Sequence, residues 1–121
     1  MGLTALLVAF GSALGGVCRY FVSLALNSQT GFPWGTLGVN VIGSLAIGAL
    51  SGWLAHGTDH AAAIRAFAVV GFCGGFTTFS TFSNEALRMM EGSQWGLFAA
   101  YVTASLTAGL AAVWLGYLIS R

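Results

Sequence analysis

The sequence carries very little charge. It contains no lysine, and only 6% of its 121 residues are charged, whereas a soluble domain typically has about 25%. The mean hydropathy of +0.86 excludes an ordinary soluble domain and predicts an integral membrane protein. A formal net charge of +1 also gives no basic surface of the kind that binds nucleic acid.

Cysteine is scarce, and the N-terminal segment lacks basic residues. The two cysteines, Cys18 and Cys73, lie in apolar segments and match no metal-ligand spacing, so we interpret them as small packing residues. The first apolar stretch continues to about Leu26 with no basic residues before it. Because this is too long for the apolar core of a signal peptide, we expect a retained first helix.

Polar breaks divide the chain into four apolar segments, each near the roughly 20 residues that a transmembrane helix needs. The breaks lie at 27–33, 56–60 and 90–94. We therefore predict an all-α membrane protein in which residues 1–121 form a single four-helix transmembrane domain. The spans are expected near 3–26, 34–55, 61–88 and 95–119.

Tryptophans bracket two of these segments. Trp34 and Trp53 flank the second segment, and Trp95 and Trp114 flank the fourth; each pair is 19 residues apart, or ~28 Å along a helix. This spacing matches a hydrocarbon core of roughly 30 Å with an indole ring at each interface.

The four arginines give no topology bias. With four spans, Arg65 and Arg121 fall on one side of the membrane and Arg19 and Arg88 toward the other. Since the Lys/Arg bias normally orients a membrane protein, a balanced chain is able to insert both ways and pair as an antiparallel, two-fold dimer. The alternative is that four residues are too few to set a bias.

A stripe of small and polar residues follows the second span. Its members repeat every four positions, so they share one face of a helix. They are Thr36, Asn40, Ser44, Gly48 and Gly52. An amide in hydrocarbon must face a partner or a water-filled path, and the residues alone leave both an ion path and interhelical packing open.

The third span contains the stretch GFCGGFTTFSTF, from Gly71 to Phe82. Two adjacent glycines followed by two threonines favour an interruption of the helix, which at membrane depth is tolerated only where the backbone lines a cavity, binds an ion or is buried. Three phenylalanines spaced by three residues follow the glycines. Positive ring edges together with hydroxyl donors suit a small anion, although a glycine packing seam with a phenylalanine stripe is the simpler alternative.

This stretch resembles the third-helix signature of the Fluc family of fluoride channels, also called CrcB. GGVCRY (Gly15–Tyr20) and GTLGVNVIGS (Gly35–Ser44) are similar to the family's first-helix and second-helix elements, in the same order and over essentially the whole chain. The resemblance implies a multi-pass protein of the bacterial inner membrane that exports fluoride passively and gives resistance to fluoride toxicity. It also implies a broken third helix and an antiparallel, dual-topology homodimer with two pores.

By that resemblance, seven residues of the last three spans are expected to line the fluoride path. They are Asn40, Phe79, Phe82, Ser80, Thr81, Tyr101 and Ser105. The backbone carbonyls of Gly74 and Thr77 correspond to those that hold a structural sodium ion at the dimer centre. Arg19 and Glu85 are expected at the vestibule, with a snorkelling Arg19 and a Glu85–Arg88 pair as the alternatives.

Other functions fit the sequence less well. A small proton-coupled multidrug exporter needs a membrane-embedded carboxylate, but three spans contain none and Glu85 lies near the end of the third. A non-transporting anchor predicts scattered glycines without a broken helix. An enzyme is not expected, because the only clustered titratable side chains, His56, Asp59 and His60, lie in a short polar loop.

Overall fold

The computed structural model describes residues 1–27 and 31–121, and every named element in this part of the chain is a helix. Three spans are single helices: α1 (Gly2–Leu26), α2 (Trp34–Leu54) and α6 (Trp95–Ser120). The third is built from consecutive pieces. They are α3 (Ala61–Ile64), the π-helix η1 (Arg65–Cys73), α4 (Gly74–Phe76) and α5 (Phe79–Glu91).

The predicted number of spans is confirmed. Within the described residues, four stretches are long and apolar enough to cross a membrane. The third extends to Glu91, three residues beyond the predicted end, because the amphipathic α5 continues past the apolar sequence.

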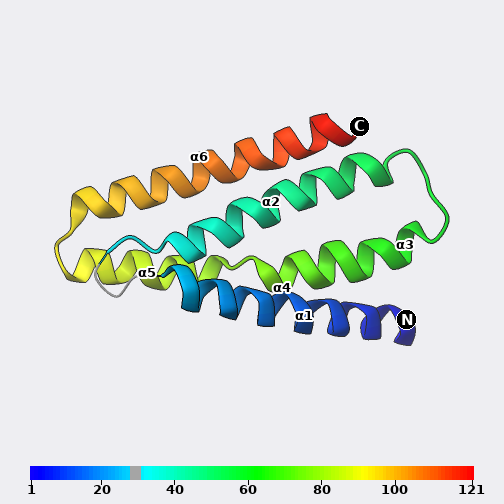
Figure 1. Ribbon diagram of the computed structural model, residues 1–121, viewed down its shortest axis with the longest axis horizontal. Coiled ribbons are helices and arrows are strands. Elements are labelled where there is room, and N and C mark those ends of the chain that lie inside the picture. The colour runs from blue at the N-terminus through cyan, green and yellow to red at the C-terminus, as the bar shows by residue number, and fades with distance from the viewer. Residues whose placement is uncertain (28–30) are drawn as a thin grey trace.

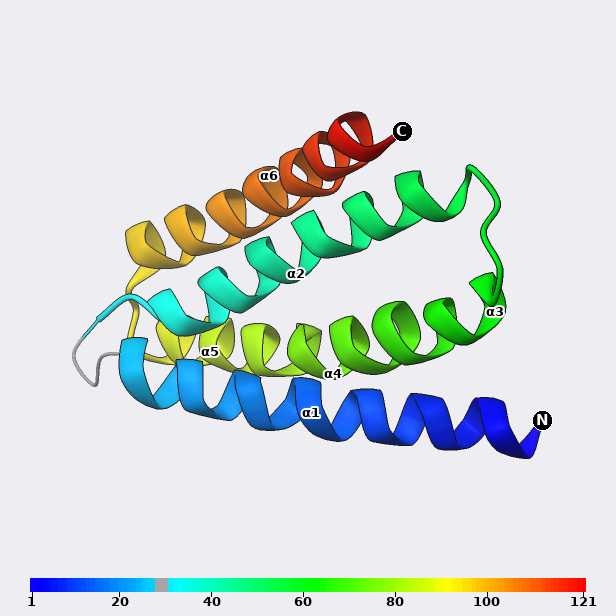
Figure 2. The same ribbon diagram turned by 45° about the vertical axis from the view of Figure 1, so that its right-hand side comes forward.

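The spans form two packed pairs. α6 lies along α2, and α1 lies along the third span (Figures 1 and 2). Both termini and the α2–α3 connection lie at one end of the bundle, here called the terminal end (Figure 1). The end of α1, the start of α2 and the α5–α6 connection lie at the other end, here called the connection end.

Glycines allow the paired helices to approach closely. A Cβ added to Gly11 or Gly15 of α1 would overlap backbone carbonyl oxygens of η1. A Cβ added to Gly48 of α2 would overlap the carbonyl of Val113, and one added to Gly116 of α6 would overlap that of Leu45. Small residues at such contacts are how helices associate in lipid, where apolar burial gives no driving force. The glycine half of the predicted α2 stripe is therefore a packing seam.

The third span is interrupted within the predicted stretch, but the extended residues begin two positions after the glycine pair. Gly74 and Gly75 are helical, whereas Thr77 (φ −87°, ψ 158°) and Thr78 (φ −152°, ψ 120°) are extended. Gly75 is required for close packing and not for the break, because a Cβ there would meet the backbone of Ser12 in α1. The glycines thus provide close packing, and the threonines form the break.

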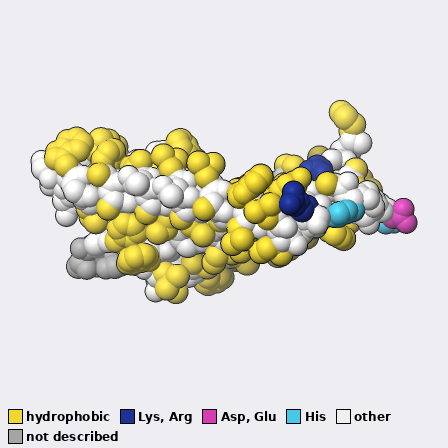
Figure 3. All heavy atoms as spheres, turned by 90° about the horizontal axis from the view of Figure 1, so that it is seen from above, with side chains coloured by type: hydrophobic (Ala, Val, Ile, Leu, Met, Phe, Trp, Pro, Cys, Tyr) yellow, Lys and Arg dark blue, Asp and Glu magenta, His cyan; other side chains and the backbone are white. Residues whose placement is uncertain are grey.

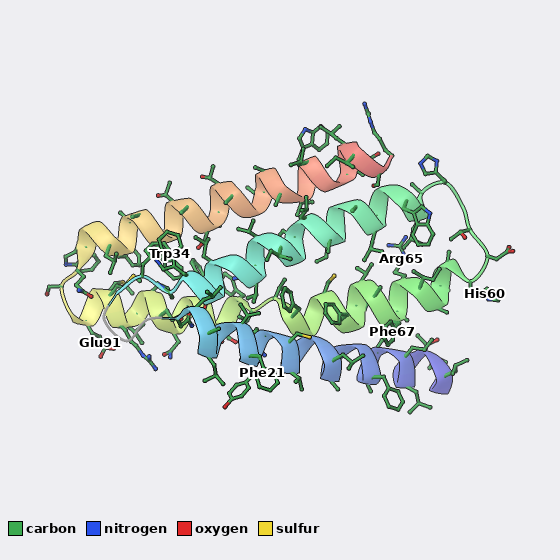
Figure 4. The ribbon with its side chains drawn as sticks, in the orientation of Figure 1. Phe21, Trp34, His60, Arg65, Phe67 and Glu91 are labelled. Carbon is green, nitrogen blue, oxygen red and sulfur yellow. The ribbon has the colours of Figure 1, made fainter. Side chains whose placement is uncertain are left out.

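The surface matches a membrane environment. Hydrophobic side chains are spread along the whole length of the face seen in Figure 3, and the basic, acidic and histidine side chains visible there lie toward one end. All four tryptophans are between 46% and 61% exposed, consistent with an interfacial belt at both ends of α2 and α6. Arg65 and His60 lie toward the terminal end and Glu91 toward the connection end (Figure 4).

Candidate functional site

The helix break is bridged by Asn40 of α2. Its side-chain carbonyl accepts a hydrogen bond from the Thr78 N–H at 2.8 Å, and its amide nitrogen donates to the Thr78 carbonyl at 3.1 Å. An amide is suited to this task because it carries a donor and an acceptor together. Asn40, in the polar half of the α2 stripe, therefore meets the extended backbone, whereas the glycine half meets α6.

The break leaves backbone carbonyls without their usual helical donors. In a continuous helix the Thr78 N–H would serve the Gly74 carbonyl, but here it donates to Asn40. The Thr81 N–H would likewise serve Thr77, but it donates to the Thr78 hydroxyl at 3.1 Å, which caps α5. The two carbonyls so released are those for which the resemblance to the Fluc family implies a sodium ion.

Arg19 serves a third carbonyl beside the break. Its Nε donates to the carbonyl of Gly75 at 3.0 Å, and its side chain is half-buried between α1 and the third span. Arg19 is thus not a freely snorkelling side chain. It places a fixed positive charge within one residue of Phe76, where α4 ends.

An open hollow of about 240 Å³ lies next to the break, between α2, α5 and α6. Its lining combines polar and apolar side chains and contains no ionisable one. The lining residues are Asn40, Ser44, Ile47, Thr77, Thr78, Phe79, Phe82, Ser105, Leu106 and Gly109. The buried hydroxyl oxygen of Ser105, a residue of this lining, has no hydrogen-bond partner among the described residues, so its hydrogen-bonding capacity is unused.

The two predicted phenylalanines lie together at this hollow. The ring centroids of Phe79 and Phe82 are 5.8 Å apart, and Phe79 is 78% exposed on the single chain. Of the other residues predicted for the path, Ser105 lies in the same wall, whereas Ser80, Thr81 and Tyr101 lie outside the lining. Tyr101 is fully buried and contacts the hollow through Phe82, with ring centroids 5.0 Å apart.

Glu85 is the acceptor of a partly buried polar cluster near the connection end, here called the Glu85 group, which consists of Asn27, Thr36, Glu85 and Tyr101. Its carboxylate accepts from the Tyr101 hydroxyl at 2.8 Å, from the Thr36 hydroxyl at 3.0 Å and from the Asn27 amide at 3.4 Å. The side chain therefore turns inward to hydroxyls and an amide, and Arg88, its alternative partner, is exposed. The sequence analysis placed Thr36 on a helix face and expected Tyr101 at the fluoride path, but it did not predict this meeting point.

Sequence reasoning also missed Asn27. The only local signal is an amide directly after an apolar span, which is an ordinary place for a polar residue. Its contacts lie with α2 and α5, so no pattern along the chain points to them.

Residues 6–117 match the family model described as "CrcB-like protein, Camphor Resistance (CrcB)". The chain belongs to the CrcB family. Relatives in this family include the fluoride-specific ion channel FluC of Agrobacterium fabrum, which is 44% identical over 95% of this chain and 94% of its own length. The fluoride-specific ion channels of Nitrobacter winogradskyi (44% identity, 96% and 94%) and Bacteroides fragilis (41%, 90% and 89%) are similar over comparable lengths.

Membership of the CrcB family confirms the resemblance on which the site residues were expected. Together with the four apolar spans, it makes this chain a multi-pass membrane protein. The match covers α1 to α6, so the break, the hollow and the Glu85 group all lie inside the family region.

Proposed function

We propose that this chain is a fluoride-specific ion channel, and not an enzyme, that releases fluoride passively across the bacterial inner membrane and so gives resistance to fluoride. The names of its CrcB relatives support this function. The structural observation that carries it is the hollow at the helix break, whose wall offers hydroxyl and amide donors and two phenylalanines but no ionised group.

This wall suits a small, strongly hydrated anion. Asn40 uses one of its two N–H groups on Thr78, which leaves the second for a passing ion. Ser105 contributes a hydroxyl that has no partner among the described residues, and Phe79 and Phe82 contribute positive ring edges. A fixed cation in the wall would bind fluoride too tightly for rapid exit, and a carboxylate would repel it.

The direction of transport follows from the membrane potential. Fluoride that accumulates in the cytoplasm carries one negative charge, and a negative-inside potential favours its exit by about 2.3 kcal/mol per 100 mV. The channel therefore needs no energy source, which is consistent with the lack of ionisable side chains in the hollow.

In this proposal the working unit is an antiparallel homodimer with a central sodium ion. Support for the dimer comes from two arginines toward each end of the bundle, which give no orientation bias. Support for the ion comes from the released carbonyls of Gly74 and Thr77, because unwound helix carbonyls are typical ligands of sodium in membranes. Ser80 and Thr81 would contribute to the path only from the dimer.

The test is efflux from liposomes that contain the purified protein. We expect rapid loss of internal fluoride and no loss of chloride under the same potential. Ser105→Ala should slow fluoride efflux, whereas Thr103→Ala, which removes an exposed hydroxyl from the same helix, should not. Fluoride efflux no faster than from protein-free liposomes would overturn the proposed function.

A further inference from the structure

The side chain of Asn27 connects three helices at the connection end. Asn27 follows the last residue of α1. Its side-chain carbonyl oxygen accepts hydrogen bonds from the N–H groups of Gly35 and Thr36 at 2.7 and 3.2 Å. It thereby serves the start of α2, where the N-cap residue Pro33 makes no side-chain cap. The amide nitrogen of the same side chain reaches the Thr36 hydroxyl and the Glu85 carboxylate of α5, each at 3.4 Å.

The orientation of this amide is fixed by its surroundings. Two backbone N–H groups face one side, so the oxygen must lie there, and a reversed amide would set donors against donors. The NH₂ group is then directed to the other side, where Glu85 offers only acceptors. Capping of α2 and donation to Glu85 are therefore two consequences of one geometry.

Glu85 depends on such donors because no cation meets it among the described residues. Each element packed around the carboxylate contributes a neutral group: Asn27 from the end of α1, Thr36 from α2 and Tyr101 from α6. Arg88, one turn further along α5, is exposed, and Arg19 is bonded to the carbonyl of Gly75. A partly buried carboxylate without a counter-ion is held in place by its hydrogen bonds.

The Glu85 group also supports the wall of the hollow. The ring of Tyr101, whose hydroxyl is held by Glu85, lies between Phe82 and Phe32 at centroid distances of 5.0 and 5.2 Å. Phe82 lines the hollow. A change in the position of Glu85 is therefore passed through Tyr101 to a phenylalanine of the path.

We propose that Asn27 is a positioning residue for ion conduction: its NH₂ group fixes the Glu85 carboxylate and, through Tyr101, the Phe82 wall of the hollow. This inference rests on the proposed fluoride channel function. It assigns to Asn27 a role beyond capping α2, and it does not require that Asn27 contact the ion.

The test uses Asn27→Asp, which separates the two roles. An aspartate still accepts from the N–H groups of Gly35 and Thr36, and a negative side chain at a helix start is favourable. Toward Glu85, however, it replaces a donor with a second carboxylate. We expect fluoride efflux at pH 7.5 to fall roughly tenfold and to recover toward pH 5.5, because a proton shared between two adjacent carboxylates restores a donor.

Two variants provide the comparison. Asn84→Asp makes the same chemical change at an exposed position next to Glu85. It therefore controls for an added negative charge beside Glu85 and should conduct like the parent at each pH. Asn27→Ala removes both roles and should lower efflux without a pH-dependent recovery. Equal efflux for Asn27→Asp and the parent at every pH would show that Asn27 only caps α2, and would overturn the inference.

A stability measurement decides the inference independently of transport. Asn27→Asp should lower the midpoint of thermal unfolding in detergent, and the added substitution Glu85→Gln should restore it, because the glutamine amide donates to the new carboxylate. Restoration supports the coupling even if the parent shows no fluoride efflux, in which case only the proposed function fails. If Glu85→Gln lowers the midpoint equally in the parent and in the Asn27→Asp variant, the two side chains are not coupled and the inference is wrong.

Discussion

The side-chain amide of Asn40 forms hydrogen bonds with both the N–H and the carbonyl of Thr78, two backbone groups that a continuous helix would pair within itself. The Thr78 N–H donates to Asn40 at 2.8 Å, and Asn40 donates to the Thr78 carbonyl at 3.1 Å. The sequence left open whether this amide serves an ion path or holds helices together. The structure places it at the hollow and makes it the clamp of the break, so its variants must be measured for both assembly and flux.

Asn40→Asp is expected to abolish fluoride efflux. The aspartate still accepts from the Thr78 N–H, but it loses both side-chain donors and, when ionised, presents a negative charge to the anion. Efflux from liposomes and a sizing column in mild detergent measure the two roles separately. Partial recovery of efflux at lower pH would be consistent with a protonated aspartate that regains a donor.

The opposite pattern would assign Asn40 to structure alone. If Asn40→Asp yields monomer on the sizing column while the remaining dimer conducts at a near-normal rate, the ion does not contact Asn40. Asn40→Ala removes both hydrogen bonds to Thr78 and should lower the free energy of unfolding by about 1–3 kcal/mol. Its stability is the standard against which the stability of Asn40→Asp is compared.

Phe79→Ile and Phe82→Ile are each expected to reduce fluoride efflux severely while the protein still assembles. Isoleucine keeps an apolar surface at the hollow but removes the positive ring edge. Phe21→Ile is the matched control, because Phe21 is 61% exposed on α1 and does not line the hollow. Normal efflux in both single variants would exclude these rings from the path.

A cysteine at Ser93 tests dual topology. Ser93 lies in the exposed connection between α5 and α6, so its side of the membrane reports the orientation of each copy. In a background without Cys18 and Cys73, an impermeant thiol reagent should label part of the protein from outside intact cells and the rest only after lysis. Complete labelling from one side, or none from outside, would contradict an antiparallel dimer.

Gly116→Ala is expected to destabilise the α2–α6 seam. The added Cβ would overlap the carbonyl of Leu45, and backbone atoms cannot move aside as a flexible side chain does. The cost should be about 1–3 kcal/mol, measured as a lower midpoint of thermal unfolding in detergent. Gly96→Ala is the control on the same helix, since a Cβ there meets nothing within 4 Å. Equal effects of the two changes would show that the close contact at Gly116 does not stabilise the α2–α6 pair.

The spans could be predicted from the sequence because their cause is local. A helix that crosses roughly 30 Å of hydrocarbon must be apolar over about 20 consecutive residues, and polar breaks between such stretches are visible in any reading of the chain. The helix break was also predicted, because glycine and β-branched threonine act on the backbone where they stand. The choice of Thr77 and Thr78 over the glycines as the extended residues was not, since it depends on contacts with α1 and α2.

The sequence by itself determined a four-span membrane helix bundle, an interruption in its third span and the residue types that an anion path requires. Only the tertiary structure decided which groups meet: Asn40 and Thr78 are 38 positions apart, Arg19 and Gly75 are 56 apart, and Asn27 and Glu85 are 58 apart. The physical reason is that a buried donor or acceptor must be satisfied, but any nearby polar group will serve. Which one is near depends on how the glycine seams set the helices against each other.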